Sequence, residues 1–332
     1  MGRKVVAFLA VLVIGVSVGV WLVQSSCRKN AFVVTASKDS SGVTVHYIDV
    51  GQGDSVFIDT PNRDVLIDSG PALAGSTVLD YLGSLNITRI HLMVATHAHA
   101  DHIGGLVAVL NSTMNVDEIL INNQTYTSKT YTNFMNLTQS HTITVAQRGQ
   151  TFILTETANL TVFNPVQPLE FTSANDANDN SVVVKLQVGN TSFLFTGDVE
   201  ADAEQSMLDA GLDLQSDILK VGHHGSRYST TQPFLDSVAP SYAIISAGED
   251  NPYGHPHQET IQKLLAKGVT IYGTFLSGTI IASTDGTSVI FEDSPEPIPE
   301  FQSSIILPIF MIATLLAVIV YRRKHLVQHL ES

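Results

Sequence analysis

Four side chains that can bind a metal ion lie within six residues, in the segment Thr96-His97-Ala98-His99-Ala100-Asp101-His102. An apolar run comes directly before them and predicts a buried strand. Alternate side chains of an extended chain point to the same side, so the imidazoles of His97 and His99 can face one ion. Asp101 and His102 follow where the chain can enter a helix, which would turn them toward a neighbouring site. Imidazole nitrogen combined with carboxylate oxygen suits Zn²⁺, Mn²⁺ or iron.

Two later groups of polar residues also follow apolar runs. Asp198 comes after Phe193-Leu194-Phe195 and a glycine, so we expect its carboxylate at the edge of a sheet. There it can bind metal, or it can cap the helix that follows. His223 and His224 come after a predicted strand over residues 217–221. Adjacent histidines at the end of a strand favour a functional role, and one of the two is expected to complete a second metal site.

The spacing His97-x-His99-x-Asp101-His102, followed by Gly104-Gly105, resembles the signature of the metallo-β-lactamase superfamily. The resemblance covers roughly residues 43–290. The chain is also similar to the β-lactamase-like domain of ComEC-type DNA-internalisation (late competence) proteins. The phrases that carry this second resemblance are Asp49-Val50-Gly51-Gln52-Gly53-Asp54, Asp179-Asn180-Ser181, Thr196-Gly197-Asp198, Lys220-Val221-Gly222-His223-His224-Gly225-Ser226 and Asn251-Pro252-Tyr253-Gly254-His255-Pro256-His257.

The resemblance implies an α/β fold, the four-layer αββα sandwich, with two bound divalent metal ions, Zn²⁺ or Mn²⁺. Asp198 is expected to bridge the two ions, and His223 matches the family's last ligand position best. His224 is left to contact substrate or to orient His223. Asp68 matches an aspartate that supports a ligand histidine, although an aspartate there also fits a turn. The expected metal ligands are His97, His99, Asp101, His102, Asp198 and His223.

One segment departs from the superfamily pattern. A third histidine usually precedes the strand that is matched here by residues 182–186, where this chain has Asn178-Asp179-Asn180-Ser181. The substitution is similar to the ComEC-type branch. It leaves the first ion dependent on oxygen ligands or water, which favours a harder metal such as Mn²⁺. It also argues against glyoxalase-like thioesterases and true β-lactamases.

Late residues are candidates for catalysis and substrate binding. In nucleic-acid-cutting branches of the superfamily, late histidines contact phosphate or protonate a leaving group, and His255 and His257 match them, although a surface loop fits these two residues equally well. An arginine near the site can meet a phosphate oxygen. Catalytic roles are therefore expected for Asp101, Asp198, His224, His255 and His257, and substrate contacts for Asn180, Ser226 and Arg227.

The ends of the chain are expected to lie in a membrane. Basic residues that flank a span usually stay in the cytosol, which places the central domain on the extracellular side of the cell membrane. The single cysteine, Cys27, lies outside that domain, so no cysteine can serve there as a ligand or nucleophile. The expected parts are an anchor or signal segment (1–28), a linker (29–41), the metallo-β-lactamase-like domain (42–292), a Pro-rich stalk (293–302), a transmembrane helix (303–321) and a cytoplasmic tail (322–332).

Charge limits the substrates of this domain. Residues 42–292 hold 9 basic and 26 acidic side chains, a net charge near −17. Such a field repels duplex DNA, so a small or single-stranded phosphodiester fits better.

Three functions are consistent with these features. The first is a phosphodiesterase or nuclease that uses a metal-bound hydroxide, with single-stranded DNA among its candidate substrates. The second is an ester or lactone hydrolase. The third is a non-enzymatic metal-binding module that assists DNA uptake beside a separate DNA-channel protein, because two terminal spans cannot themselves form a channel.

Overall fold

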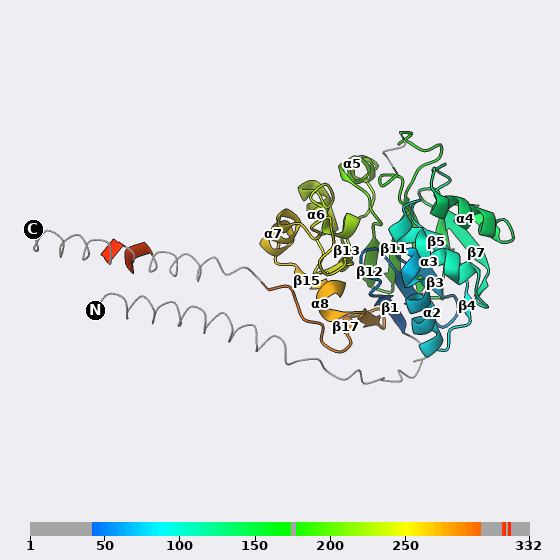
Figure 1. The fold of residues 1–332 in the computed structure, drawn as a ribbon, viewed down its shortest axis with the longest axis horizontal. Helices are drawn as coiled ribbons and strands as arrows, with labels where there is room; N and C mark the ends of the chain where they lie inside the picture. The colour runs from blue at the N-terminus through cyan, green and yellow to red at the C-terminus, as the bar shows by residue number, and fades with distance from the viewer. Residues whose placement is uncertain (1–41, 174–176, 300–313, 317, 320–332) are drawn as a thin grey trace, which may run out of the picture. The chain divides into compact units, whose positions relative to one another are not determined.

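The computed structural model describes residues 42–173, 177–299, 314–316 and 318–319. In this part of the chain, most strands belong to two large sheets (Figure 1). The first sheet has the order β17 (Val289–Phe291), β16 (Ile280–Thr284), β1 (Val43–Tyr47), β2 (Val56–Asp59), β3 (Val65–Ile67), β5 (Leu92–Ala95), β7 (Glu118–Ile121) and β8 (Thr142–Val145). The second has the order β15 (Thr270–Gly273), β14 (Tyr242–Ile245), β13 (Ile218–Lys220), β12 (Thr191–Phe195), β11 (Val183–Val188), β10 (Ala158–Asn164) and β9 (Thr151–Ile153). Two short strands, β4 (Arg89–Ile90) and β6 (Asn115–Val116), pair separately.

Each sheet is half antiparallel and half parallel. Strands β3, β5, β7 and β8 run parallel in the first sheet, as do β12, β13, β14 and β15 in the second. Parallel strands need helical crossovers, which cover the outer face of each sheet. Since parallel strands end at the same edge, the residues that follow β3 and β5, or β12 and β13, are brought together there.

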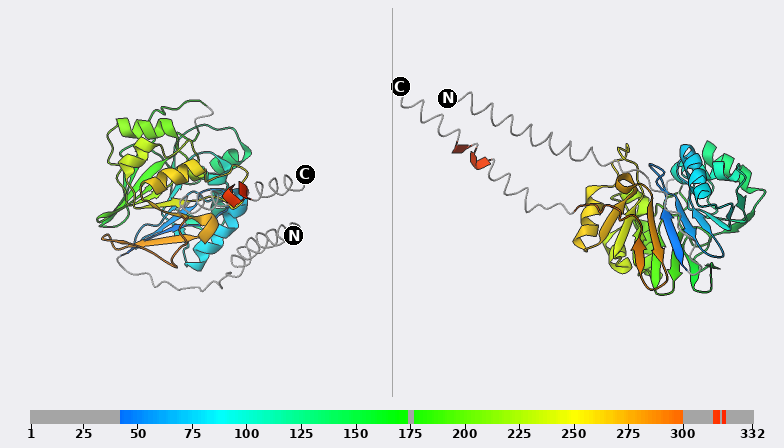
Figure 2. Two further views of the ribbon diagram at one scale, coloured as in Figure 1. Left: turned by 90° about the vertical axis from the view of Figure 1, so that its left-hand side faces the viewer. Right: turned by 90° about the horizontal axis from the view of Figure 1, so that it is seen from below.

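Three apolar clusters make four layers. Side chains of both sheets, among them Val45, Leu160 and Phe193, form the central cluster. The outer face of the first sheet packs against α2 (Gly75–Ser84), α3 (Ala100–Leu110) and α4 (Lys129–Thr138). The outer face of the second sheet packs against α5 (Ala201–Asp209), α6 (Gln232–Val238) and α7 (Gln258–Ala266). Figures 1 and 2 show the two groups of helices on opposite sides of the strands. The predicted four-layer αββα sandwich is confirmed.

Three one-turn helices complete the described elements. They are η1 (Ala72–Ala74), η2 (Gly222–Gly225) and α8 (Thr274–Ser277). Of these, η2 contains both His223 and His224.

The segments flanking the domain bear on the membrane predictions. Among the helices of the described residues, none has both the length and the apolar character needed to cross a bilayer. The predicted anchor at 1–28, the linker at 29–41, most of the predicted span at 303–321 and the tail at 322–332 lie outside the described residues. Residues 293–299 of the predicted stalk are described. Ile298 packs on the second-sheet cluster, and its N–H donates to the Ile271 carbonyl.

Candidate metal centre

The ends of strands from both sheets supply the candidate metal ligands. In the first sheet, Asp68 follows β3 and His97 follows β5. In the second sheet, Asp198 follows β12, and η2 follows β13. Helix α3 begins just after His99, so Asp101 lies in its first turn, as the sequence predicted.

Asp198 lies at the centre of the cluster and is almost fully buried. Its Oδ2 atom is 3.1 Å from His102 Nε2 and 3.5 Å from His224 Nε2. The Nε2 atoms of His97 and His223 are farther from the same oxygen, at 3.8 and 3.9 Å. A carboxylate in this position can bridge two ions.

The donor atoms fall into two groups that share Asp198. His97, His99 and Asp198 form one group, and Asp54, His102, Asp198 and His224 form the other. Within each group, the candidate ligand atoms lie within 4.8 Å of one another. The residues therefore form two candidate metal-binding groups that share one carboxylate.

The buried atoms of the cluster lack other partners. Apart from their contacts with carboxylate oxygens of the cluster, His102 Nε2 and His224 Nε2 are buried without a hydrogen-bond partner among the described residues, and so is Asp198 Oδ1. Since buried polar atoms are nearly always paired, such atoms gathered within one cluster are expected of ligands to an ion. This agreement supports the metal assignment independently of the sequence motif.

A buried carboxylate holds the outer nitrogen of His102. His102 Nδ1 is 2.7 Å from Asp68 Oδ2. Asp68 also accepts hydrogen bonds from the backbone N–H of Thr96 at 2.9 Å and from its hydroxyl at 2.6 Å. Asp68 therefore fixes the ring of His102 with Nε2 directed toward Asp198. The geometry fits the supporting role expected of Asp68, although its φ of 53° also makes it a turn residue.

His224 is held in a similar way. Its Nδ1 atom lies 2.9 Å from the carbonyl oxygen of Ser246 and 3.2 Å from Asp54 Oδ1. Asp54 in turn contacts Lys220 Nζ at 2.6 Å, and both side chains are buried. Sequence reasoning missed the roles of Asp54 and Lys220. Two features of the sequence could have indicated these roles: Lys220 ends a buried strand, and Asp54 ends a glycine-rich phrase.

A close backbone approach fixes the loop that carries Asp54. A Cβ atom on Gly53 would lie 2.2 Å from the carbonyl oxygen of Asp101, and the φ of Gly53 is +142°. The N–H of Asp54 donates to that same oxygen at 3.2 Å. The glycine-rich loop therefore packs directly on the first turn of α3 and sets the position of Asp54 relative to the histidine cluster.

The charges of the cluster are strongly coupled. Burial alone raises the pKa of Asp198, but the charges of His102 and His224 hold it well below the usual value. Burial alone lowers the pKa of His224, but Asp198 and Asp54 raise it to about 10. For the same reasons the pKa of His102 is well above its usual value. The carboxylates thus attract positive charge, and a bound metal ion would take the place of these protons.

His223 and His224 lie differently relative to the cluster. It belongs to neither ligand group, whereas His224 belongs to one. The two residues have φ values of 47° and 55°, and His223 Nδ1 contacts Glu200 Oε1 at 2.9 Å. The structure thus places His224 in a candidate ligand group, whereas the sequence favoured His223 as the ligand and His224 as its support. Asp101 lies beside this cluster, with Oδ2 3.4 Å from His224 Nε2.

His255 lies next to the candidate metal centre, and His257 lies farther out. The ring of His255 is 5.3 Å from that of His223 and 6.1 Å from that of His224. His257 is one ring farther, 4.9 Å from His255, and its Nδ1 accepts from the N–H of Arg227 at 3.2 Å. Burial, followed by the neighbouring histidine charges, lowers the pKa of His255 to about 4, so its ring is neutral near pH 7.

The three residues that were expected to contact substrate make hydrogen bonds or ion pairs within the protein. The Ser226 hydroxyl is buried and accepts from the Tyr228 N–H at 3.3 Å. Arg227 is exposed and lies 3.2 Å from Glu259. The amide of Asn180 donates to the carbonyl of Phe171 at 2.6 Å. None of these three side chains belongs to the two ligand groups formed by the described residues.

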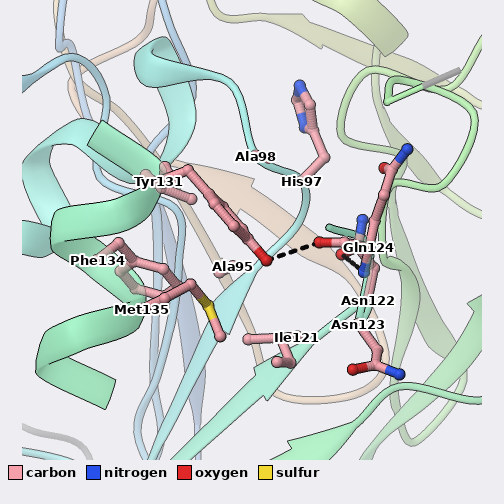
Figure 3. Close-up of a pocket in the computed structure, with 11 residues that line it drawn as sticks. Ala95, His97, Ala98, Ile121, Asn122, Asn123, Gln124, Tyr131, Phe134 and Met135 are labelled. Atoms are coloured by element: carbon pink, nitrogen blue, oxygen red, sulfur yellow. Dashed lines mark hydrogen bonds between the residues drawn. The ribbon is translucent and has the colours of Figure 1, made fainter. Parts of the chain in front are cut away.

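A small cavity borders His97 on the side of α4. Its volume of about 20 Å³ holds about one water molecule. The Tyr131 hydroxyl donates to the Gln124 carbonyl at 2.8 Å, and the imidazole of His97 points away from Phe134 and Met135 (Figure 3). The cavity is too small for a substrate.

Comparisons with known proteins agree with this geometry. A family model described as the Metallo-beta-lactamase superfamily matches residues 48–249. The chain is 30% identical over 261 residues to ComE operon protein 3 of Bacillus subtilis, which covers 73% of this chain and 33% of that protein. It is also 30% identical over 245 residues to Competence protein ComA of Neisseria gonorrhoeae, covering 73% and 32%. The chain thus spans about a third of the length of these relatives.

Among solved structures, Igni18, a novel metallo hydrolase from Ignicoccus hospitalis, is 16% identical with a TM-score of 0.49. The alignment covers 72% of this chain and 98% of that one.

Proposed function

The chain belongs to the metallo-beta-lactamase superfamily, as its motifs predicted, and we propose that it is a metal-dependent hydrolase that cleaves phosphodiesters. The observation that carries this proposal is the position of Asp198, which is shared by two groups of candidate ligands. A two-metal arrangement suits displacement at phosphorus, because it can stabilise both the attacking and the leaving oxygen. The competence proteins among its relatives support a nucleic-acid substrate.

The ligands follow from the two groups. His97, His99 and Asp198 would hold one ion, and His102, His224 and Asp198 the other, whereas Asp54 is paired with Lys220. Asp101, beside His224, would complete the second site. Bound divalent ions, Mn²⁺ or Zn²⁺, would supply Lewis-acid polarisation of the phosphoryl group and lower the pKa of a water molecule.

Other residues of the chain would orient and assist the reaction. Asp68 and Asp54 hold the outer nitrogens of His102 and His224, so the two rings do not turn when substrate enters. His255 is neutral near pH 7, and its ring N–H can donate a hydrogen bond to the leaving oxygen. The Nδ1 atom of His255 is buried without a hydrogen-bond partner among the described residues.

Ester or lactone hydrolysis is the alternative that the charge of the domain favours. With 26 acidic against 9 basic residues between positions 42 and 292, the surface suits a neutral substrate better than a polyanion. The absence of the usual third histidine, at residues 178–181, favours phosphodiester chemistry instead. A non-enzymatic module for DNA uptake would use the same metal site without turnover.

We also propose that terminal membrane anchors hold the domain on the extracellular side. In that arrangement a separate DNA-channel protein would be its partner in uptake, and single-stranded DNA its substrate. Protease accessibility of the domain in intact cells tests the sidedness.

A substrate panel separates the three functions. The purified protein is assayed with Mn²⁺ or Zn²⁺ on bis-p-nitrophenyl phosphate, a single-stranded oligonucleotide and a set of lactones. We expect phosphodiester hydrolysis that is lost in Asp101→Ala and Asp198→Ala while circular dichroism shows an intact fold. Hydrolysis of lactones alone would favour the alternative enzyme. Activity that survives both substitutions would refute the metal mechanism, and inactivity with every metal and substrate would favour the non-enzymatic module.

A further inference from the structure

A chain of ring contacts leads from the buried cluster to an exposed tyrosine. The ring of His255 lies 6.1 Å from that of His224, and the ring of Tyr253 lies 5.8 Å from that of His255 at an interplanar angle of 24°. Tyr253 is 62% exposed. One face of an aromatic ring is therefore presented to solvent two rings from a candidate metal ligand.

The position of Tyr253 is fixed by its loop. Asn251 Oδ1 accepts from the backbone N–H groups of Tyr253 and His255, each at 3.1 Å. The Asn251 amide donates to the carbonyl oxygens of His255, at 2.5 Å, and of Gly248, at 2.9 Å. One side chain thus ties the loop to the segment that follows β14, so the backbone that carries the exposed ring is held in place before any ligand arrives.

A second tyrosine flanks the centre from the other sheet. The ring of Tyr126, in the loop after β7, meets that of His99 edge-on at 5.4 Å. Further ring contacts, between His97 and His99, His97 and His102, and His102 and His224, join the two ends of the series across the cluster. Tyrosine side chains from loops of both sheets therefore flank the candidate metal ligands.

We propose that Tyr253 stacks on an unpaired base next to the scissile phosphate, with Tyr126 on the opposite side, so that the site selects single-stranded nucleic acid over duplex. This inference rests on the proposed phosphodiesterase function. Every base has a face that can stack on an aromatic ring, whereas the bases of a duplex are already stacked on one another. Stacking needs no positive charge, which agrees with an acidic domain whose nearby Arg227 is paired with Glu259.

The experiment compares two single-stranded oligonucleotides of equal length and charge. One carries normal bases, and the other carries abasic sites on both sides of a single cleavable phosphodiester. The ratio kcat/KM is measured on both for the wild type, Tyr253→Ala, Tyr253→Phe and Tyr228→Ala. Tyr228 is a matched control, because it is 64% exposed and not part of the ring series.

We expect Tyr253→Ala to lower kcat/KM on the base-bearing strand by about 5- to 150-fold, as stacking on one base implies. The same variant should leave the abasic strand unchanged, and Tyr253→Phe and Tyr228→Ala should behave like the wild type. Equal loss on both strands would show a merely structural role. Equal loss in Tyr228→Ala, or duplex cleaved as fast as single strand, would overturn the assignment.

Binding separates this inference from the proposed function. If the wild type hydrolyses no phosphodiester, the proposed function fails. Fluorescence anisotropy of the two labelled strands then still tests the stacking. Tighter binding of the base-bearing strand, lost in Tyr253→Ala, would support it, and equal binding of both strands by the wild type would overturn it.

Discussion

Replacing Lys220 by methionine is expected to destabilise the fold by about 3 to 5 kcal/mol, because it removes the cation that lies closest to the buried carboxylate of Asp54. Lys220 is 1% exposed, and its Nζ lies 2.6 Å from Asp54 Oδ2. Burial alone raises the pKa of Asp54, and Lys220 is the strongest of the charges that lower it instead. Without Lys220, Asp54 would keep the contact of its Oδ1 atom with His224 Nδ1, at 3.2 Å.

The assay is urea unfolding of the metal-free protein at pH 7, followed by circular dichroism. Lys267→Met is the matched control, because Lys267 lies the same 2.6 Å from Asp236 but both side chains are exposed. Surface pairs contribute about 0 to 1 kcal/mol, so this control should unfold close to the wild type. The double variant Lys220→Met, Asp54→Leu should recover part of the loss. Equal, small effects of the Lys220 and Lys267 substitutions would refute the reasoning.

Four further substitutions, which make three predictions, test other parts of the account. Burial raises the pKa of Glu204 from 4.5 to about 7, so the folded state retains a proton that the unfolded chain releases and stability falls as the pH rises through this range. Urea unfolding at pH 5 and pH 8 measures this loss of stability, which is expected to reach up to about 3 kcal/mol in the wild type. The loss should be absent in Glu204→Gln. Gly105→Ala should destabilise by about 1 to 3 kcal/mol, because its Cβ would lie 1.9 Å from a backbone oxygen. Gly83→Ala, in open space on α2, should instead stabilise by up to about 1 kcal/mol. Asp68→Asn should weaken metal binding about 10- to 100-fold in equilibrium dialysis, because His102 loses its supporting carboxylate.

Each of these has an outcome that contradicts it. Wild type and Glu204→Gln with parallel pH profiles would mean that Glu204 does not retain a proton. Gly105→Ala as stable as Gly83→Ala would mean that α3 can move away from the first sheet. Unchanged metal affinity in Asp68→Asn would make Asp68 only a turn residue.

The first half of the site was predictable because its residues are close in sequence. His97, His99 and His102 follow one apolar strand. The alternation of side chains in extended backbone and the start of the next helix decide where their side chains point. Asp198 was also found, because it ends another apolar strand. The fold followed from the family resemblance that these residues carry, while the order of strands in each sheet could not be read from the sequence.

The choice between His223 and His224 could not be made from the sequence. Both follow the same strand, and their orientation depends on two successive left-handed backbone positions. Residues other than glycine adopt that conformation rarely, so no local pattern indicates it. The pairing of Lys220 with Asp54 was missed for a different reason, because it joins two sheets through residues far apart in the chain.

The most direct test of the central claim is the number of metal ions bound when Asp198 is replaced. Equilibrium dialysis with Mn²⁺ or Zn²⁺ is expected to give two ions per chain for the wild type. His99→Ala should retain one ion, since the group of His102, Asp198 and His224 stays intact. Asp198→Ala should lose high-affinity binding of both. Two ions bound with unchanged affinity in Asp198→Ala would contradict a centre built around this carboxylate.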